Sequence, residues 1–138
     1  MDLDQRKIAL GLARARAING ITLLVLPGFV GKRLFGEHGG SAISRAVLRM
    51  IGVRDLVLGV GAITTLKEHS MDAEWVGMGA IADAIDGAVM LLTPGLPLRS
   101  RLGAIAGGSA ALAGYQASRA LSDERTERQA LEASEIDS

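Results

Sequence analysis

The chain has 138 residues, which is enough for one hydrophobic core but not for two. It carries 15 basic and 15 acidic side chains, so no net charge points to nucleic acid or an acidic substrate, and aromatic residues, at 3%, are too few for base stacking. It has no cysteine, which excludes disulfides, thiolate metal sites and cysteine nucleophiles.

Small residues make up an unusual share of the apolar sequence. Glycine occurs 18 times, and 49% of the residues are hydrophobic although the mean hydropathy is only +0.29. A water-soluble helical core is normally filled with Leu, Ile and Phe, whereas helices in lipid pack closely through Gly and Ala. The composition therefore favours a membrane protein over a soluble helical bundle.

A basic segment precedes the first apolar run. Its basic residues are Arg6, Lys7, Arg14 and Arg16. Residues 17–31 are uncharged, and with the preceding turn they are long enough to cross roughly 30 Å of hydrocarbon at about 1.5 Å per residue. This predicts a first span over residues 14–31, which Pro27 should kink or end. A glycine-rich turn at residues 34–40 then leads to Ser41, a suitable N-cap for the next helix.

The second predicted span, residues 46–66, is amphipathic in its first half and apolar in its second half. Arg45 and Arg49 are four residues apart and share a helix face, where they can meet anionic lipid head groups. Arg54 and Asp55 stand side by side immediately before an uncharged run of eleven residues. This part of the helix should therefore enter the membrane more deeply than its beginning.

The third predicted span covers residues 73–92, where Asp83 and Asp86 interrupt an otherwise apolar segment. Gly79, Asp83 and Gly87 recur every four residues, which places them along one helix face. Small residues on either side of a carboxylate indicate that another helix lies against it.

The fourth predicted span covers residues 102–119 and begins with 17 uncharged residues. Within it, Gly103, Gly107 and Ala111 have the spacing that lets helices in lipid pack closely. The same stripe could serve packing inside the chain or association with a second copy.

These elements predict an all-α protein, an antiparallel four-helix transmembrane bundle with short loops. The membrane domain would be residues 1–122, and residues 123–138 an acidic cytoplasmic tail that extends the last helix and becomes disordered. Two observations oppose this prediction: no segment reaches roughly 18 charge-free residues, and a charge at mid-bilayer costs about 2.5–3.5 kcal/mol. Opposite charges that neutralise one another inside the bundle would lower this cost.

The candidate site consists of Arg54, Asp55, Asp83 and Asp86. In a functional interpretation, Asp83 or Asp86 acts as a general acid or binds a cation, while Arg54 orients an anionic substrate. In a structural interpretation, Arg54 pairs with an aspartate of the third span and fixes the helix register. Because neighbouring residues diverge on a helix, Arg54 and Asp55 cannot both face the third span squarely.

No cofactor or metal is expected. The dipeptides Glu37-His38 and Glu68-His69 would lie on opposite sides of the membrane, so they cannot share a metal. The glycines at residues 28–31 and 59–61 lack the length and context of phosphate-binding or dinucleotide-binding loops. Only two histidines are present, and neither belongs to a recognisable Ser/His/Asp motif.

The pattern R-x-I-G-V-R-D-L-V-L-G at residues 49–59 is followed by G-A-I-A-D-A-I-D-G at residues 79–87. This combination resembles a family of small four-span integral membrane proteins, domain of unknown function 4267. The similarity covers roughly residues 15–118. It implies four membrane helices and no chemistry, because that family has no assigned activity, and no catalytic residue can be carried over.

The distribution of basic residues predicts an orientation. With the N-terminus in the cytoplasm, the basic residues inside would be Arg6, Lys7, Arg14, Arg16, Lys67, Arg119, Arg125 and Arg128. Those outside would be Lys32, Arg33, Arg99 and Arg101, with Arg45 if the loop extends that far. The positive-inside rule therefore places both termini in the cytoplasm of a bacterial inner membrane.

Three functions are compatible with the sequence. The preferred one is a non-catalytic accessory, structural or lipid-binding membrane protein whose partners are membrane lipids, a second copy of itself or another membrane protein. The second is a membrane-embedded acid–base enzyme or transporter for a lipid-soluble substrate, which would use Asp83 or Asp86. The third is a soluble helical interaction module.

Overall fold

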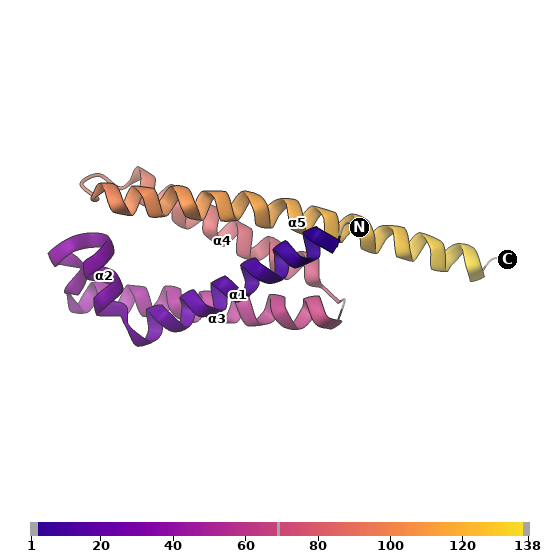
Figure 1. Cartoon of the computed structure of the whole chain (residues 1–138), viewed down its shortest axis with the longest axis horizontal. Coiled ribbons are helices and arrows are strands. Elements are labelled where there is room, and N and C mark those ends of the chain that lie inside the picture. The colour runs from indigo at the N-terminus through magenta and orange to yellow at the C-terminus, as the bar shows by residue number, and fades with distance from the viewer. Residues whose placement is uncertain (1–2, 69, 137–138) are drawn as a thin grey trace.

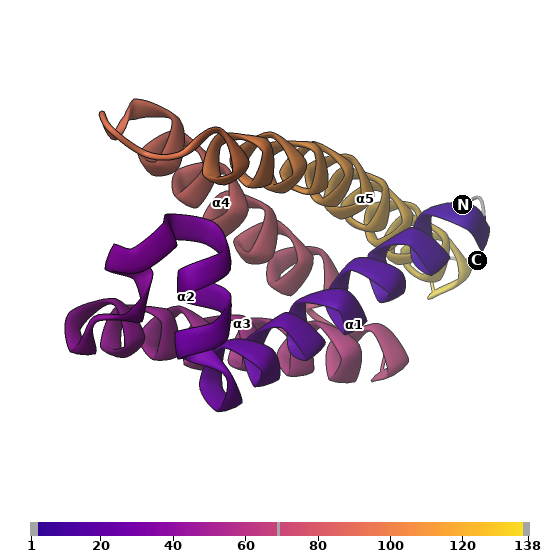
Figure 2. The same cartoon turned by 60° about the vertical axis from the view of Figure 1, so that its left-hand side comes forward.

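A computed structural model describes residues 3–68 and 70–136, and all regular structure in these residues is helical, as predicted. The elements are α1 (Leu3–Val25), α2 (Pro27–Phe35), the 3-10 helix η1 (Gly36–Gly40), α3 (Ala42–Glu68), α4 (Asp72–Leu92) and α5 (Leu98–Ile136). The four long helices lie side by side, and successive ones run in opposite directions (Figure 1). The short helix α2 lies at one end, beside the start of α3 (Figure 2).

The first predicted span is divided by its proline. Leu26 leaves the helical conformation with φ −120° and ψ 40°, and Pro27 begins α2. A proline in the first turn of a helix costs no hydrogen bond because that N–H would have no partner anyway. The predicted N-cap at Ser41 is confirmed, since the backbone N–H of Ser44 donates to Ser41 Oγ over 3.1 Å.

Helices α1 and α3 are in backbone contact through three glycines. A Cβ atom at Gly20 would lie 2.5 Å from the backbone nitrogen of Leu56. One at Gly52 would lie 2.8 Å from the carbonyl oxygen of Gly20, and one at Gly59 would lie 2.6 Å from the nitrogen of Ala17. These two helices therefore form one closely packed pair that tolerates no side chain at the crossing.

Helices α4 and α5 form the second pair, but not through the expected glycines. Added Cβ atoms at Gly103 and Gly107 would meet nothing within 4 Å. The contact instead uses Ala104, whose carbonyl oxygen lies 3.2 Å from a Cβ built at Gly87, and Gly114, which packs on Ala80. Gly103 and Gly107 are therefore not at the closest contact between α4 and α5, and both line a hollow between the helices.

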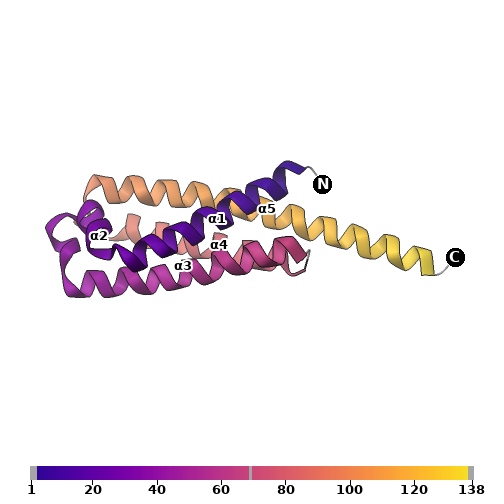
Figure 3. The same cartoon turned by 60° about the horizontal axis from the view of Figure 1, so that its bottom comes forward.

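The C-terminal part of α5 projects beyond the other helices (Figures 1 and 3). The segment expected as a disordered tail is helical as far as Ile136, and no break marks the expected boundary after residue 122. Helix-favouring residues and the ion pair between Arg128 and Glu124, four residues apart, account for the continuation.

Small side chains lie inside and large apolar side chains outside. Most of the buried hydrophobic residues are alanines, such as Ala13, Ala62 and Ala117. Large exposed apolar residues occur on all four long helices, and they include Ile18, Ile21, Val53, Val57, Ile81, Ile85, Ile105 and Leu112. This distribution is the reverse of the one that a water-soluble helical protein uses.

By length and hydropathy, two helical segments could cross a membrane, Gln5–Val25 in α1 and Asp72–Leu92 in α4. In the rest of the described chain, α3 and α5 do not meet the same criteria. Both carry arginines within or next to their apolar stretches.

Candidate functional site

Six polar side chains meet between the two helix pairs in what we call the inner network. Its members are Arg16 and Asn19 from α1, Arg54 and Asp55 from α3, and Asp83 and Asp86 from α4. The network therefore connects the α1–α3 pair with the α4–α5 pair through α4.

Arg16 links α1 to α4. Its guanidinium forms an ion pair with Asp83 and donates a 2.8 Å hydrogen bond to the carbonyl oxygen of Gly79. The side chain is only 12% exposed, and its second terminal nitrogen lies 3.6 Å from Asp55. Gly79 makes this approach possible, because a Cβ there would lie 3.0–3.1 Å from the guanidinium.

Arg54 links α3 to α4 at the edge of the network. Its two terminal nitrogens donate to the two oxygens of Asp86 over 2.9 and 2.5 Å, which is the bidentate geometry that makes arginine–carboxylate pairs strong. It also donates to Asp55 over 3.0 Å. Both Arg54 and Asp86 are about one-third exposed, so this pair lies nearer the surface than Arg16.

Asp55 is the centre of the inner network. It is buried, and it accepts hydrogen bonds from Arg54 and from the side-chain amide of Asn19, the latter over 2.8 Å. A terminal nitrogen of Arg16 lies 3.6 Å from the same carboxylate oxygen that Arg54 binds. Two guanidiniums and an amide give this buried carboxylate polar partners in place of water, which explains how it can lie between helices.

Two hollows flank the inner network. One of about 210 Å³ lies among α1, α3, α4 and α5, and the other, of about 420 Å³, opens towards α2. Asn19, Asp55 and Asp83 line both hollows, so the network forms the wall between them. Asp86 lines only the larger one, together with mainly apolar side chains.

The structure brings all four predicted site residues together. Arg54 pairs with Asp86 of α4, while its neighbour Asp55 turns towards α1, as the helical geometry required. Arg16 and Asn19 were missed, because Arg16 was assigned to the basic segment before the first span. Its position three residues before a polar Asn19, inside the apolar half of α1, is the signal that could have identified both.

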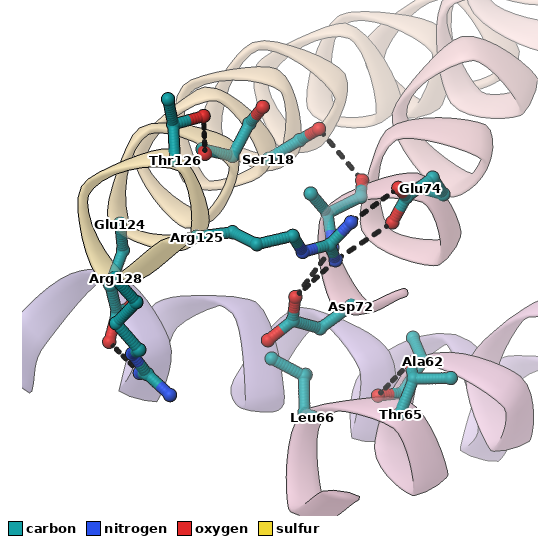
Figure 4. A network of polar contacts seen from close by, with 12 residues as sticks. Ala62, Thr65, Leu66, Asp72, Glu74, Ser118, Glu124, Arg125, Thr126 and Arg128 are labelled. Atoms are coloured by element: carbon teal, nitrogen blue, oxygen red, sulfur yellow. Dashed lines mark hydrogen bonds and ion pairs between the residues drawn. The ribbon is translucent and has the colours of Figure 1, made fainter. Parts of the chain in front are cut away.

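A second polar cluster lies at the end of the molecule opposite α2, around the first turn of α4 (Figure 4). The buried carboxylate of Asp72 accepts hydrogen bonds from Arg6 of α1 over 2.7 Å and from Arg125 of α5 over 3.0 Å. Arg125 also binds both oxygens of Glu74, and this hydrogen bond raises the pKa of its guanidinium. The first turn of α4 is thereby tied to both α1 and α5.

Asp72→Ala is expected to lower the free energy of unfolding by about 1.5–3 kcal/mol, because hydrogen bonds to charged groups are lost and two arginines lose their shared partner. Thermal unfolding in detergent, followed by circular dichroism, measures the change. Asp123→Ala is the matched control, since Asp123 is exposed on α5 and should change the unfolding temperature little.

No metal site forms among the described residues. Glu37 and His38 are exposed in η1, Glu68 is exposed at the end of α3, and His69 lies outside the described residues.

No family model, no curated protein and no solved structure matches the chain. The resemblance to the four-span membrane family therefore stays a prediction, and function has to be argued from the geometry.

Proposed function

We propose that the chain is a small integral membrane protein whose four long helices cross the bilayer, and that it has a structural, accessory or lipid-binding role without catalysis of its own. The observation that carries this proposal is the reversed distribution of side chains. Large apolar residues face outwards on every long helix, while alanines and the Arg16–Asp83 pair lie inside.

The exposure of the candidate spans supports the membrane rather than the soluble alternative. Only 28% of the apolar window in α1 and 22% of that in α4 is buried inside the protein. A core helix of a soluble protein would be mostly buried, because exposed apolar surface of this extent promotes aggregation. Acyl chains would cover these faces instead.

The inner network removes the main objection to insertion of α3 and α4. An ionisable side chain that faces lipid is costly, but one that pairs inside the helix assembly is tolerated. Arg54, Asp55 and Asp83 all have partners of opposite charge. We propose that their role is to fix the register between the two helix pairs.

We further propose a bacterial inner membrane with both termini in the cytoplasm. Since Arg16 faces inwards, it no longer counts towards the basic residues on the cytoplasmic side. A reporter fused at Ser138 tests the orientation, and activity found only outside the cytoplasm would reverse it.

Extraction of membranes with alkaline carbonate tests the proposal as a whole. The full-length protein should stay in the pellet and enter solution only with detergent, because its outer faces are apolar. Release into the carbonate supernatant would instead support the soluble interaction module.

A membrane-embedded acid–base enzyme or transporter for a lipid-soluble substrate is the second candidate. It is favoured by the 420 Å³ hollow, where Asp83 and Asp86 lie among apolar side chains. Two buried nitrogens without a hydrogen-bond partner belong to the same network: Nη1 of Arg16, which lies 3.6 Å from Asp55, and Nε of Arg54, whose terminal nitrogens bind Asp86.

Asp83→Asn and Asp86→Asn distinguish the two candidates. If each variant accumulates and folds normally while a cellular phenotype of the deletion is no longer complemented, the enzyme or transporter is favoured. If folded protein is lost together with the phenotype, the carboxylates are architectural. Gel filtration in detergent will show whether Gly103 and Gly107, where an added Cβ would meet nothing within 4 Å, serve association with a second copy.

A further inference from the structure

The end of the molecule that carries α2 and η1 is strongly basic. Its cationic residues, which we call the basic end, are Lys32, Arg33, Arg45, Arg49, Arg99 and Arg101. None of them forms an ion pair with another described residue, and Glu37 is the single acidic residue in the segments 26–50 and 93–104. The opposite end differs, because there Arg6 and Arg125 are neutralised by Asp72 and Glu74.

A hollow of about 690 Å³ lies at the basic end. Phe29, Lys32, Arg33 and Leu34 of α2 line it together with Arg99 of α5. Three of the five lining residues are therefore cations, contributed by two helices that are far apart in the sequence. A single anion in this hollow would meet positive charge from both sides.

The position of Arg99 is fixed by its contacts. Its Nε donates to the carbonyl oxygen of Leu34 over 3.2 Å, and the hydroxyl of the fully buried Ser100 donates to the same oxygen over 2.6 Å. A terminal nitrogen of Arg99 lies 3.0 Å from where a Cβ at Gly36 would be. The start of α5 is thus fastened to the end of α2, and Arg99 lines the same hollow as Lys32 and Arg33.

Large apolar side chains adjoin these cations. Phe29, which lines the hollow, is 68% exposed, and Leu98, next to Arg99 in the chain, is 73% exposed. A small soluble anion would gain nothing from these residues. An amphiphile with a phosphate head and acyl chains would use both features, since the head meets the cations and the chains lie along the apolar side chains.

We infer that this hollow binds the phosphate head group of an anionic phospholipid, with Lys32, Arg33 and Arg99 as the cationic contacts and Phe29 beside the acyl chains. The inference rests on the membrane location proposed above. It adds a specific lipid class and a specific site to a general affinity for membranes.

Native mass spectrometry of the full-length protein in detergent, titrated with phosphatidylglycerol or with phosphatidylcholine of the same acyl chains, tests the site. Wild type should bind phosphatidylglycerol more tightly than phosphatidylcholine. The variant K32Q/R33Q should bind phosphatidylglycerol roughly 25-fold more weakly, because each basic residue near an anionic head group contributes about fivefold. K32R/R33K, which keeps both charges, should bind like wild type.

The matched control is K7Q/R14Q, which removes two exposed cations from α1 outside the basic end and should keep wild-type affinity. Equal weakening of K32Q/R33Q and K7Q/R14Q, or equal binding of the two lipids by wild type, would overturn the inference. So would displacement of the lipid by glycerol phosphate at equal concentration, because the site would then take a free anion.

The carbonate extraction separates this result from the membrane proposal. Protein that stays in the membrane but shows no preference for phosphatidylglycerol contradicts only the lipid site. Protein that the carbonate releases contradicts the membrane location itself.

Discussion

Replacing Arg16 with methionine is expected to lower the free energy of unfolding by about 3–5 kcal/mol, the usual effect of removing one partner of a buried ion pair. The side chain is only 12% exposed and pairs with Asp83 on α4, while it also approaches Asp55 on α3. Methionine fills similar space but leaves Asp83 with no cationic partner. Unfolding by SDS in mixed micelles measures the loss.

Two variants show whether charge pairing causes this effect. Arg14→Met changes the same residue type two positions earlier, where the side chain is exposed, and should leave stability almost unchanged. The double variant R16M/D83N should regain much of the lost stability, because it removes the unpaired carboxylate, while Asp55 keeps Arg54 and Asn19. Equal stability of R16M and R14M would show that the inner network does not hold the helices together.

Gly20→Ala is expected to destabilise the protein by about 1–3 kcal/mol, although alanine is the better helix former. The added Cβ would lie 2.5 Å from the backbone nitrogen of Leu56 and 2.7 Å from the carbonyl oxygen of Gly52. Backbone atoms cannot turn aside as a flexible side chain can, so α1 and α3 would have to separate. Thermal unfolding in detergent detects this change.

Gly11→Ala provides the control on the same helix. A Cβ at Gly11 meets nothing within 4 Å, so the substitution should be neutral or stabilise by up to about 1 kcal/mol through helix propensity alone. The opposite signs of the two alanine substitutions are the expected result. Two equally mild effects would contradict backbone contact between α1 and α3.

The sequence was sufficient to identify the residues that α3 and α4 contribute to the inner network. Arg54, Asp55, Asp83 and Asp86 interrupt apolar segments, and unpaired charges in such places are too costly to leave without partners. This cost predicted that the charges pair with one another. Helix geometry predicted that Arg54 and Asp55 point in different directions. The contribution of α1 did not follow, because Arg16 comes after Arg6, Lys7 and Arg14 and was therefore assigned to the same basic segment.

The packing faces were harder to predict than the charges. The spacing of Gly103 and Gly107 matched a known close-packing pattern, yet the contact between α4 and α5 uses Ala104 and Gly114. Gly20 was not singled out, although it lies where α1 and α3 cross in backbone contact. Spacing shows which residues share a face, but the rotation of a helix depends on all its neighbours at once.

The two ends of the molecule differ in how their charges are paired. Asp72 ties α1, α4 and α5 together at one end, whereas the basic end has cations without carboxylate partners among the described residues. The inner network lies between them and separates two hollows. A structural role for the middle and a lipid-binding role for one end are therefore compatible in one small protein.

Cysteine labelling tests the membrane location most directly, because the natural chain has no cysteine and each introduced one is unique. Val57→Cys, Ile85→Cys and Leu112→Cys place thiols at positions that are 54–60% exposed, while Ser134→Cys places one on the projecting part of α5. In membrane fragments with both surfaces accessible, a water-soluble, membrane-impermeant maleimide should label Ser134→Cys and leave the other three unlabelled until detergent and denaturant are added. Labelling of all four at similar rates in the intact fragments would show that water, not lipid, covers the helices.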